Sequence, residues 1–240
     1  TFWGFEVFGG YSSQSGTSMA APIVSGVCGM VWAADSKLTG AQVKEIVCNN
    51  TDTIVAASPE SASSQSYNMV NAHLAVQEAV YMDYLRSKEY KSYTDEWYEK
   101  PVEYSILDIN QDGIPELIIN SKTSMGWFNT MMCTYDTQKD KVIVMKDVYN
   151  WSGVRYSERF KTLTYSEMRY TVAGGFGGQQ FYTIENNKLK ESYFVGYDFN
   201  VSDDYYFISI NGNDDRILKS TYDFYYEDVK HIEYEPLSDI

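Results

Sequence analysis

A serine at the start of an apolar, periodic segment is the first candidate for chemistry. The seven residues from Gly16 to Pro22 read Gly-Thr-Ser-Met-Ala-Ala-Pro, and apolar residues then recur at spacings of three and four. This spacing predicts a helix from Thr17 to about Trp32, with Ser18 and Pro22 near its first turn. The unpaired N–H groups there carry partial positive charge, so the amide of Ser18 could stabilise the oxyanion of acyl transfer. Ser18 is the candidate nucleophile; the alternative is that Gly-Thr-Ser only caps the helix.

An acidic loop is the second candidate. From Asp108 onward, oxygen-bearing side chains occupy relative positions 1, 3, 5 and 9, and a glycine follows the third of them. Such spacing lets a short loop wrap a hard cation such as Ca²⁺. The loop departs from an EF-hand because position 12 is Ile119 and because its flanks alternate as strands. The alternative is a polar hairpin turn. The expected ligands are the side chains of Asp108, Asn110, Asp112 and Glu116 and the carbonyl of Ile114.

Other polar stretches predict turns rather than sites. Asn211 and Gly212 carry the Asn-Gly signature of a two-residue hairpin turn, and the pair Asp203 and Asp204 indicates another exposed turn. The glycine-rich run 174–178 lacks the strand-to-helix context of a phosphate-binding loop. We therefore expect it to form a flexible connection between strands.

The elements that must position these residues change in kind along the chain. After the first helix, periodicity predicts helices at 41–48, beginning at Thr39 or Gly40, and at 70–84, with a polar loop at 56–66 between them. Beyond about residue 85 the composition shifts to Tyr, Asp, Asn, Phe and Lys, and short alternating runs predict strands. The strand candidates are 102–107, 117–119, 142–145, 169–172, 181–184 and 205–210.

Composition narrows the classes of partner. A formal net charge of -14 argues against nucleic acid and against anionic lipid. No apolar run approaches the ~20 residues of a membrane span, so none is expected. The 22 tyrosines favour a β-rich portion. The three cysteines lack the spacing of a disulfide framework, and we expect Cys28 and Cys48 to be small core residues of helices.

The string from Gly16 to Pro22 resembles the serine motif of the subtilase family. Segments 39–47 and 67–72 resemble the next helix of that family and the strand-to-helix segment that closes its catalytic domain. The resemblance covers about a third of the chain, all before residue 85, and departs from the usual pattern at Ile23, where family members carry His. It implies peptide-bond hydrolysis through an acyl-enzyme on Ser18, a protein or peptide substrate, and an extracellular or cell-surface location.

The resemblance also implies that these residues lack the other catalytic groups of the family. In subtilases the catalytic Asp and His and the oxyanion-hole Asn precede the Ser. The 17 residues before Ser18 contain no His and no Asn, and the two histidines, His73 and His231, match no family base. We therefore expect residues 1–85 to be the C-terminal segment of an α/β subtilisin-like domain, inactive by itself.

Residues 90–240 are expected to form a β-rich accessory domain, either all-β or α+β, with the boundary between residues 85 and 95. Its acidic loop resembles the Asp-x-Asn-x-Asp-Gly calcium loops of integrin-type repeats. The alternative function is a non-catalytic, calcium-dependent binding or anchoring module that carries a vestigial protease segment. Catalytic Asp, His and Asn motifs upstream of these residues would favour the peptidase.

Overall fold

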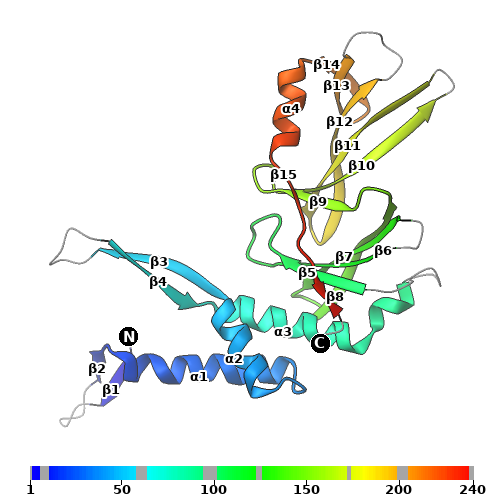
Figure 1. Ribbon diagram of the computed structural model, residues 1–240. Coiled ribbons are helices and arrows are strands. Elements are labelled where there is room, and N and C mark those ends of the chain that lie inside the picture. Colours follow the sequence, from blue (N-terminus) through cyan, green and yellow to red (C-terminus); the bar gives the residue numbers. More distant parts are fainter. Residues whose placement is uncertain are drawn as a thin grey trace. The chain divides into compact units, whose positions relative to one another are not determined.

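The chain forms two compact units, residues 1–87 and residues 88–240, in a computed structural model (Figure 1). The structure describes residues 2–5, 11–57, 64–93, 102–122, 126–171, 174–198 and 205–237.

The first unit contains three helices and two antiparallel strand pairs within its described residues. The helices are α1 (Thr17–Ala34), α2 (Gly40–Asn49) and α3 (Ala72–Ser87). The strand pairs are β1 (Phe2–Phe5) with β2 (Tyr11–Gln14), and β3 (Thr51–Ala57) with β4 (Ser64–Val70). The three predicted helices are confirmed to within a few residues. The loop predicted at 56–66 is too long at both ends, because β3 extends into its start and β4 into its end. The β-branched run that begins at Thr51 favours this extended pairing.

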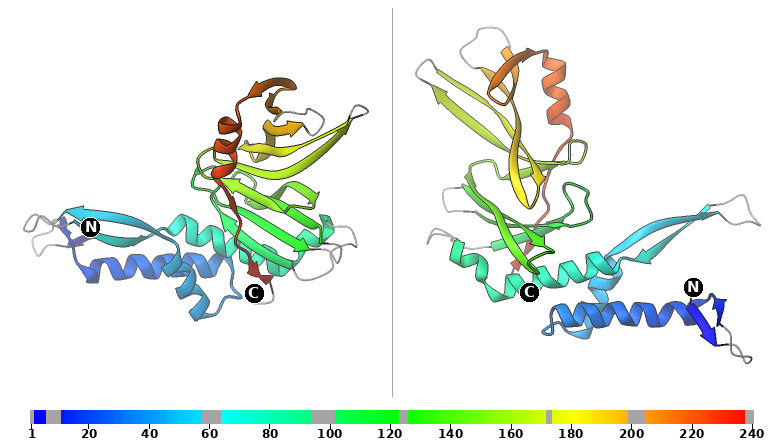
Figure 2. Two further views of the ribbon diagram at one scale, coloured as in Figure 1. Left: turned by 45° about the horizontal axis from the view of Figure 1, so that its top comes forward. Right: turned by 180° about the vertical axis from the view of Figure 1, so that it is seen from behind.

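An aliphatic cluster holds the three helices together. Val27 and Val31 of α1 are buried in it, and α1 lies beside α3 (Figures 1 and 2). The other buried members are Leu38, Val43, Ile46, Val47, Ala75 and Ala79. We name this set the helical cluster. It uses one side of α1 around these two valines, while Ile23, Val24 and Met30 stay exposed.

Cys48 also lies outside the helical cluster. Its neighbours Ile46 and Val47 turn inward, and Cys48 is exposed on the outer side of α2, so its expected core position is wrong. Cys28 is half-buried and packs against the cluster, as expected. All three cysteines are free thiols, in keeping with the lack of a disulfide framework.

Polar contacts fix the ends of these helices. Asp35 ends α1, and its buried carboxylate forms an ion pair with Arg86 at the end of α3. Asn71 precedes α3. Its side-chain oxygen accepts a hydrogen bond from the backbone amide of Leu74 at 3.1 Å, and its backbone amide donates to the carbonyl of Asn50 at 2.9 Å. Burying a charge is costly unless it is paired, so the ion pair ties α1 to α3.

Helix α1 is also apolar along its length. Its 18 residues have a mean hydropathy of 1.4, so by length and composition alone it could cross a membrane, which the sequence reading did not anticipate. A mostly buried core helix and a signal sequence near the N-terminus pass the same test. Only 11% of α1 is buried, through Val27 and Val31 in the helical cluster.

The described part of the second unit consists of two antiparallel sheets, the helix α4 (Lys219–Glu227) and a short 3₁₀ helix, η1 (Glu89–Tyr93). The five-stranded sheet has the order β16-β5-β6-β7-β8. Its strands are β5 (Val102–Leu107), β6 (Glu116–Lys122), β7 (Phe128–Asp136), β8 (Lys141–Asn150) and β16 (Glu235–Pro236). Helix α4 lies beside β12 (Lys188–Asp198) and β13 (Tyr205–Ile210) of the other sheet (Figures 1 and 2).

The seven-stranded sheet has the order β14-β13-β12-β11-β10-β9-β15. Its strands are β9 (Val154–Ser157), β10 (Thr162–Thr171), β11 (Gly174–Glu185), β12 (Lys188–Asp198), β13 (Tyr205–Ile210), β14 (Asn213–Ile217) and β15 (Val229–His231). The strands predicted from alternation are confirmed, apart from Val172, which lies outside the described residues. The turn predicted at Asn211 and Gly212 is confirmed, with φ of 53° and 79°. Asp203 and Asp204 lie outside the described residues.

The C-terminal segment joins the two sheets. Strand β15 pairs with β9 of the larger sheet, and β16 pairs with β5 of the smaller one, as the red end of the chain shows in Figure 1. Between these strands Ile232 is buried in a core that includes Ile118 of the smaller sheet and Leu163 of the larger one. One hydrophobic core therefore serves both sheets.

The glycine-rich run is a strand rather than the predicted connection. Residues 174–178 begin β11, where Gly178 pairs opposite Gly196 of β12. A Cβ atom on Gly178 would lie 2.3 Å from the carbonyl oxygen of Val195 and 2.5 Å from the ring of Phe194. Close approach of backbone and ring therefore requires glycine here, a packing reason that local sequence does not reveal.

Substituting Gly178 tests this packing. We expect Gly178→Ala to lower the free energy of unfolding of the second unit by about 2–3 kcal/mol, because the added methyl group overpacks β11 against β12. Urea denaturation followed by near-ultraviolet circular dichroism measures the change. Gly40→Ala is the control, since a Cβ atom there meets nothing within 4 Å. Equal effects of the two substitutions would contradict the packing account.

Candidate functional site

Ser18 is the second residue of α1 and is exposed. The N-cap of the helix is Gly16, which makes no side-chain cap hydrogen bond. The carbonyl of Gly16 accepts the amides of Met19 at 3.0 Å and Ala20 at 3.1 Å. The amides of Thr17 and Ser18 therefore precede the first helical hydrogen bond. This confirms the predicted position of Ser18 in the first turn and gives no support to the interpretation of Gly-Thr-Ser as a side-chain cap.

Pro22 lies deeper in α1 than the sequence reading placed it. It is the sixth residue of the helix, in the second turn. Proline has no N–H, so the carbonyl of Ser18, four residues earlier, lacks its usual helical donor. The first turn is held instead by the two hydrogen bonds to Gly16, which leaves both backbone groups of Ser18 outside the regular helical pattern.

No base accompanies Ser18 in the described part of the chain. There its hydroxyl makes no hydrogen bond to another side chain, and the two histidines lie elsewhere: His73 is exposed on α3, and His231 is exposed on β15 of the second unit. A serine hydroxyl is a weak nucleophile until a base removes its proton. The described residues thus supply a positioned hydroxyl and a helix terminus, but no proton acceptor.

The acidic loop between β5 and β6 is closed by its own side chains. The carboxylate of Asp108 accepts the amides of Asp112 at 3.1 Å and Gly113 at 3.0 Å. The side-chain oxygen of Asn110 also accepts the amide of Asp112, at 3.1 Å, and Asp112 accepts the amide of Ile114 at 2.8 Å. These contacts are typical of Asx turns. They bring Asp108, Asn110 and Asp112 onto one short loop.

Glu116 is the buried end of this loop. It is 1% exposed, and its Oε2 accepts the amide of Ile109 at 3.0 Å. The pKa of Glu116 is raised to about 8, mainly by burial; the Ile109 hydrogen bond lowers it, and the nearby charges of Asp112 and Asp108 contribute to the rise. Among the residues that the structure describes, no three His, Cys, Asp or Glu side chains gather as a metal site.

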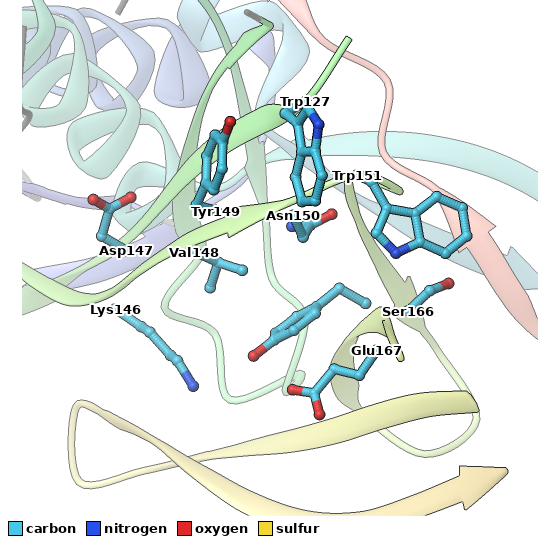
Figure 3. A pocket seen from close by; sticks show the side chains of 10 residues that line it. Trp127, Lys146, Asp147, Val148, Tyr149, Asn150, Trp151, Ser166 and Glu167 are labelled. Carbon is cyan, nitrogen blue, oxygen red and sulfur yellow. The ribbon is translucent and has the colours of Figure 1, made fainter. Parts of the chain in front are cut away.

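An aromatic groove in the second unit was not foreseen from the sequence. It has a volume of about 720 Å³ and runs along β8 toward β10 (Figure 3). The residues that line it are Trp127, Lys146, Asp147, Val148, Tyr149, Asn150, Trp151, Tyr165, Ser166 and Glu167. The signal in the sequence was a pair of tryptophans, Trp127 and Trp151, on either side of a predicted strand.

Comparison with known proteins bears on the first unit. Residues 6–76 match the model of the Subtilase family, a family of serine peptidases. The match includes Ser18 and all of α1 and α2, and it supports a subtilisin-like peptidase at the level of the family. It covers less than a third of the chain, and the second unit lies outside it. No curated protein and no solved structure matches the chain.

The buried Glu116 generates a prediction for stability against pH. Its folded pKa of about 8 exceeds its ordinary value of 4.5, so between these values the folded state binds more protons than the unfolded state. The raised pKa stabilises the folded state by a few kcal/mol at most. This stabilisation is fully present below about pH 4.5 and is lost as the pH rises through about 8. Urea unfolding in chelator at pH 5, 6.5 and 8 measures it.

Glu116→Gln is the matched variant, because it keeps the hydrogen-bond acceptor but cannot ionise. We expect its stability to depend less on pH than that of the wild type over this range. Glu185→Gln, at an exposed position on β11, is the control and should follow the wild type. If Glu116→Gln and the wild type give parallel profiles, Glu116 does not titrate in this range.

Proposed function

We propose that Ser18 is the nucleophile of a subtilisin-like serine endopeptidase that cleaves peptide bonds through an acyl-enzyme. One observation carries this proposal: the exposed serine in the first turn of α1 lies within the segment that matches the Subtilase family. The substrate would be a protein or peptide, and the family resemblance favours an extracellular or cell-surface location.

The chemistry follows from the position of Ser18. Its Oγ would attack the scissile carbonyl while a base takes the hydroxyl proton; the base then returns that proton to the leaving amine. The negative charge that forms on the carbonyl oxygen is stabilised at a helix N-terminus, where the amide of Ser18 points outward. Water then hydrolyses the acyl-enzyme. In this proposal the base, its Asp partner and the oxyanion-hole Asn come from outside these 240 residues.

The exposed side of α1 supports a larger catalytic domain. Ile23, Val24 and Met30 are exposed beside the helical cluster. Full burial of one such side chain is worth roughly 1.5–3 kcal/mol, so covering this side would add substantially to stability. A catalytic domain that packs against this face would hold α1, and with it Ser18, from both sides.

Removing the nucleophile tests the proposal. In the full-length protein we expect Ser18→Ala to lower kcat/KM for casein cleavage by at least about 10³-fold, because no acyl-enzyme can form. Thr17→Ala, at the exposed neighbouring position, is the control and should retain most of the activity. The 240-residue chain by itself should not cleave casein. Full activity in Ser18→Ala, or cleavage by the 240-residue chain that depends on Ser18, would contradict the proposal.

A second proposal concerns the acidic loop, for which we infer Ca²⁺ binding. The donor set is all oxygen, as a hard cation requires, and Asp108 and Asn110 already converge on the same amide of Asp112. A carboxylate oxygen that accepts one hydrogen bond keeps a further lone pair for a metal ion. Glu116 and the carbonyl of Ile114 would complete the set. The alternative function, a calcium-dependent binding or anchoring module, rests on this loop alone.

Thermal unfolding tests calcium binding. Extracellular modules bind calcium at roughly 10⁻⁴–10⁻³ M, so 1 mM CaCl₂ should stabilise the second unit by about 0.4–1.4 kcal/mol and raise its Tm by up to a few degrees over EDTA. MgCl₂ should do less, because Mg²⁺ keeps its waters. Asp112→Ala should lose the shift and Asp214→Ala, an exposed acid on β14, should keep it. If calcium leaves the wild-type Tm unchanged, or shifts the Tm of Asp112→Ala equally, the loop is a polar turn that does not bind calcium.

A further inference from the structure

The aromatic groove of the second unit is explained neither by the peptidase segment nor by the acidic loop. It lies along β8, which is the last strand of the five-stranded sheet, and its other wall comes from β10. Its volume of about 720 Å³ falls within the range of roughly 300–1,000 Å³ that is usual for small-molecule sites. All of its residues belong to one compact unit, so the groove is complete within the second unit.

Large aromatic rings are exposed in this groove. Trp127 and Tyr149 stack with centroids 5.1 Å apart and planes 12° from parallel, yet they remain 38% and 54% exposed. Trp151 is 51% exposed. Figure 3 shows Trp127 and Tyr149 side by side, with Trp151 just beyond the end of the strand that carries Tyr149. Exposed apolar surface gathered in one place is uncommon on soluble proteins and marks a binding surface.

Hydrogen-bonding groups also line the groove. The phenol of Tyr165 lies 2.6 Å from that of Tyr182 and is hydrogen-bonded to the carboxylate of Glu167. The ammonium of Lys146 sits 4.1 Å from the centre of the Tyr182 ring. The carboxylate of Asp147 lies on the side of Tyr149 in Figure 3. The groove thus contains both flat apolar faces and hydrogen-bond donors and acceptors.

The rings and the charges of the groove disfavour two classes of ligand. The near-parallel rings of Trp127 and Tyr149 offer a flat surface rather than the aromatic cage that recognises an organic cation. A polyanion would meet the carboxylates of Asp147 and Glu167 on a chain of net charge -14. A neutral ligand with flat apolar faces and a polar edge satisfies both constraints.

A pyranose ring has this chemistry. Its axial C–H groups form apolar faces that stack on aromatic rings, and its equatorial hydroxyls both donate and accept hydrogen bonds. A proline-rich peptide would also use the rings, but it offers no hydroxyls to Asp147, Ser166 and Glu167. We propose that the groove binds a neutral oligosaccharide, with Trp127, Tyr149 and Trp151 as stacking surfaces and with Asp147, Ser166 and Glu167 as partners of its hydroxyls.

Affinity electrophoresis of the 240-residue chain tests this inference. Native gels would contain neutral polysaccharides (a β-glucan, a xyloglucan, a glucomannan and a neutral xylan), or polygalacturonate as the anionic comparison. We expect at least one neutral polysaccharide to retard the chain and polygalacturonate not to. Oligosaccharides of the retarding polymer should then quench tryptophan fluorescence, which distinguishes a site for free sugar chains from one that needs a polymer surface.

Variants assign the binding to the groove. Trp151 lies outside the strands, so Trp151→Ala should leave the sheets intact and weaken binding by at least tenfold. Trp127→Ala should weaken binding to the same extent, and Glu167→Gln should weaken it less. Phe224→Ala, an exposed aromatic residue on α4 outside the groove, is the control and should bind as the wild type. Near-ultraviolet circular dichroism verifies that each variant folds.

The inference is overturned by any of three results: no neutral polysaccharide retards the chain, Trp151→Ala and the wild type are retarded equally, or a proline-rich peptide binds the groove where the sugars do not.

Discussion

Burial of Val27 and Val31 in the helical cluster is the contact on which the position of Ser18 depends. These valines anchor the second half of α1 against α2 and α3, and the buried ion pair between Asp35 and Arg86 locks its end. The first half of α1, with Ser18 at its start, extends from that anchor with its apolar side chains exposed. A rigid helix fixed at one end presents its positive N-terminus at the other, which is where an acyl-transfer reaction needs it.

The second unit is organised differently. Its two sheets share one core, and the C-terminal segment pairs with both of them, so long-range contacts rather than local helices hold it together. The acidic loop connects β5 and β6 of the five-stranded sheet, and the aromatic groove is lined by β8 of that sheet and by β10 of the larger one.

Local patterns predicted local structure. Periodicity placed α1 and its serine, alternation placed the strands, and the Asn-Gly pair placed the turn after β13, because each depends on residues close in sequence. Two predictions failed because the outcome depends on packing between distant segments. The exposure of Cys48 depends on which side of α2 the helical cluster covers, and the need for glycine at position 178 depends on the ring of Phe194 in the neighbouring strand. The groove was missed for the same reason, since Trp127, Tyr149 and Glu167 meet only through strand order and sheet packing.

Covalent labelling of the full-length protein tests the central claim most directly. A fluorophosphonate reacts only with a serine whose hydroxyl is activated, and peptide mass spectrometry locates the adduct. If Ser18 is the nucleophile, we expect a single modified peptide that carries the adduct on Ser18. Labelling should be lost when the protein is unfolded before the reagent is added. An adduct on another serine, or no adduct in protein that cleaves peptides, would contradict the assignment of Ser18 as the nucleophile.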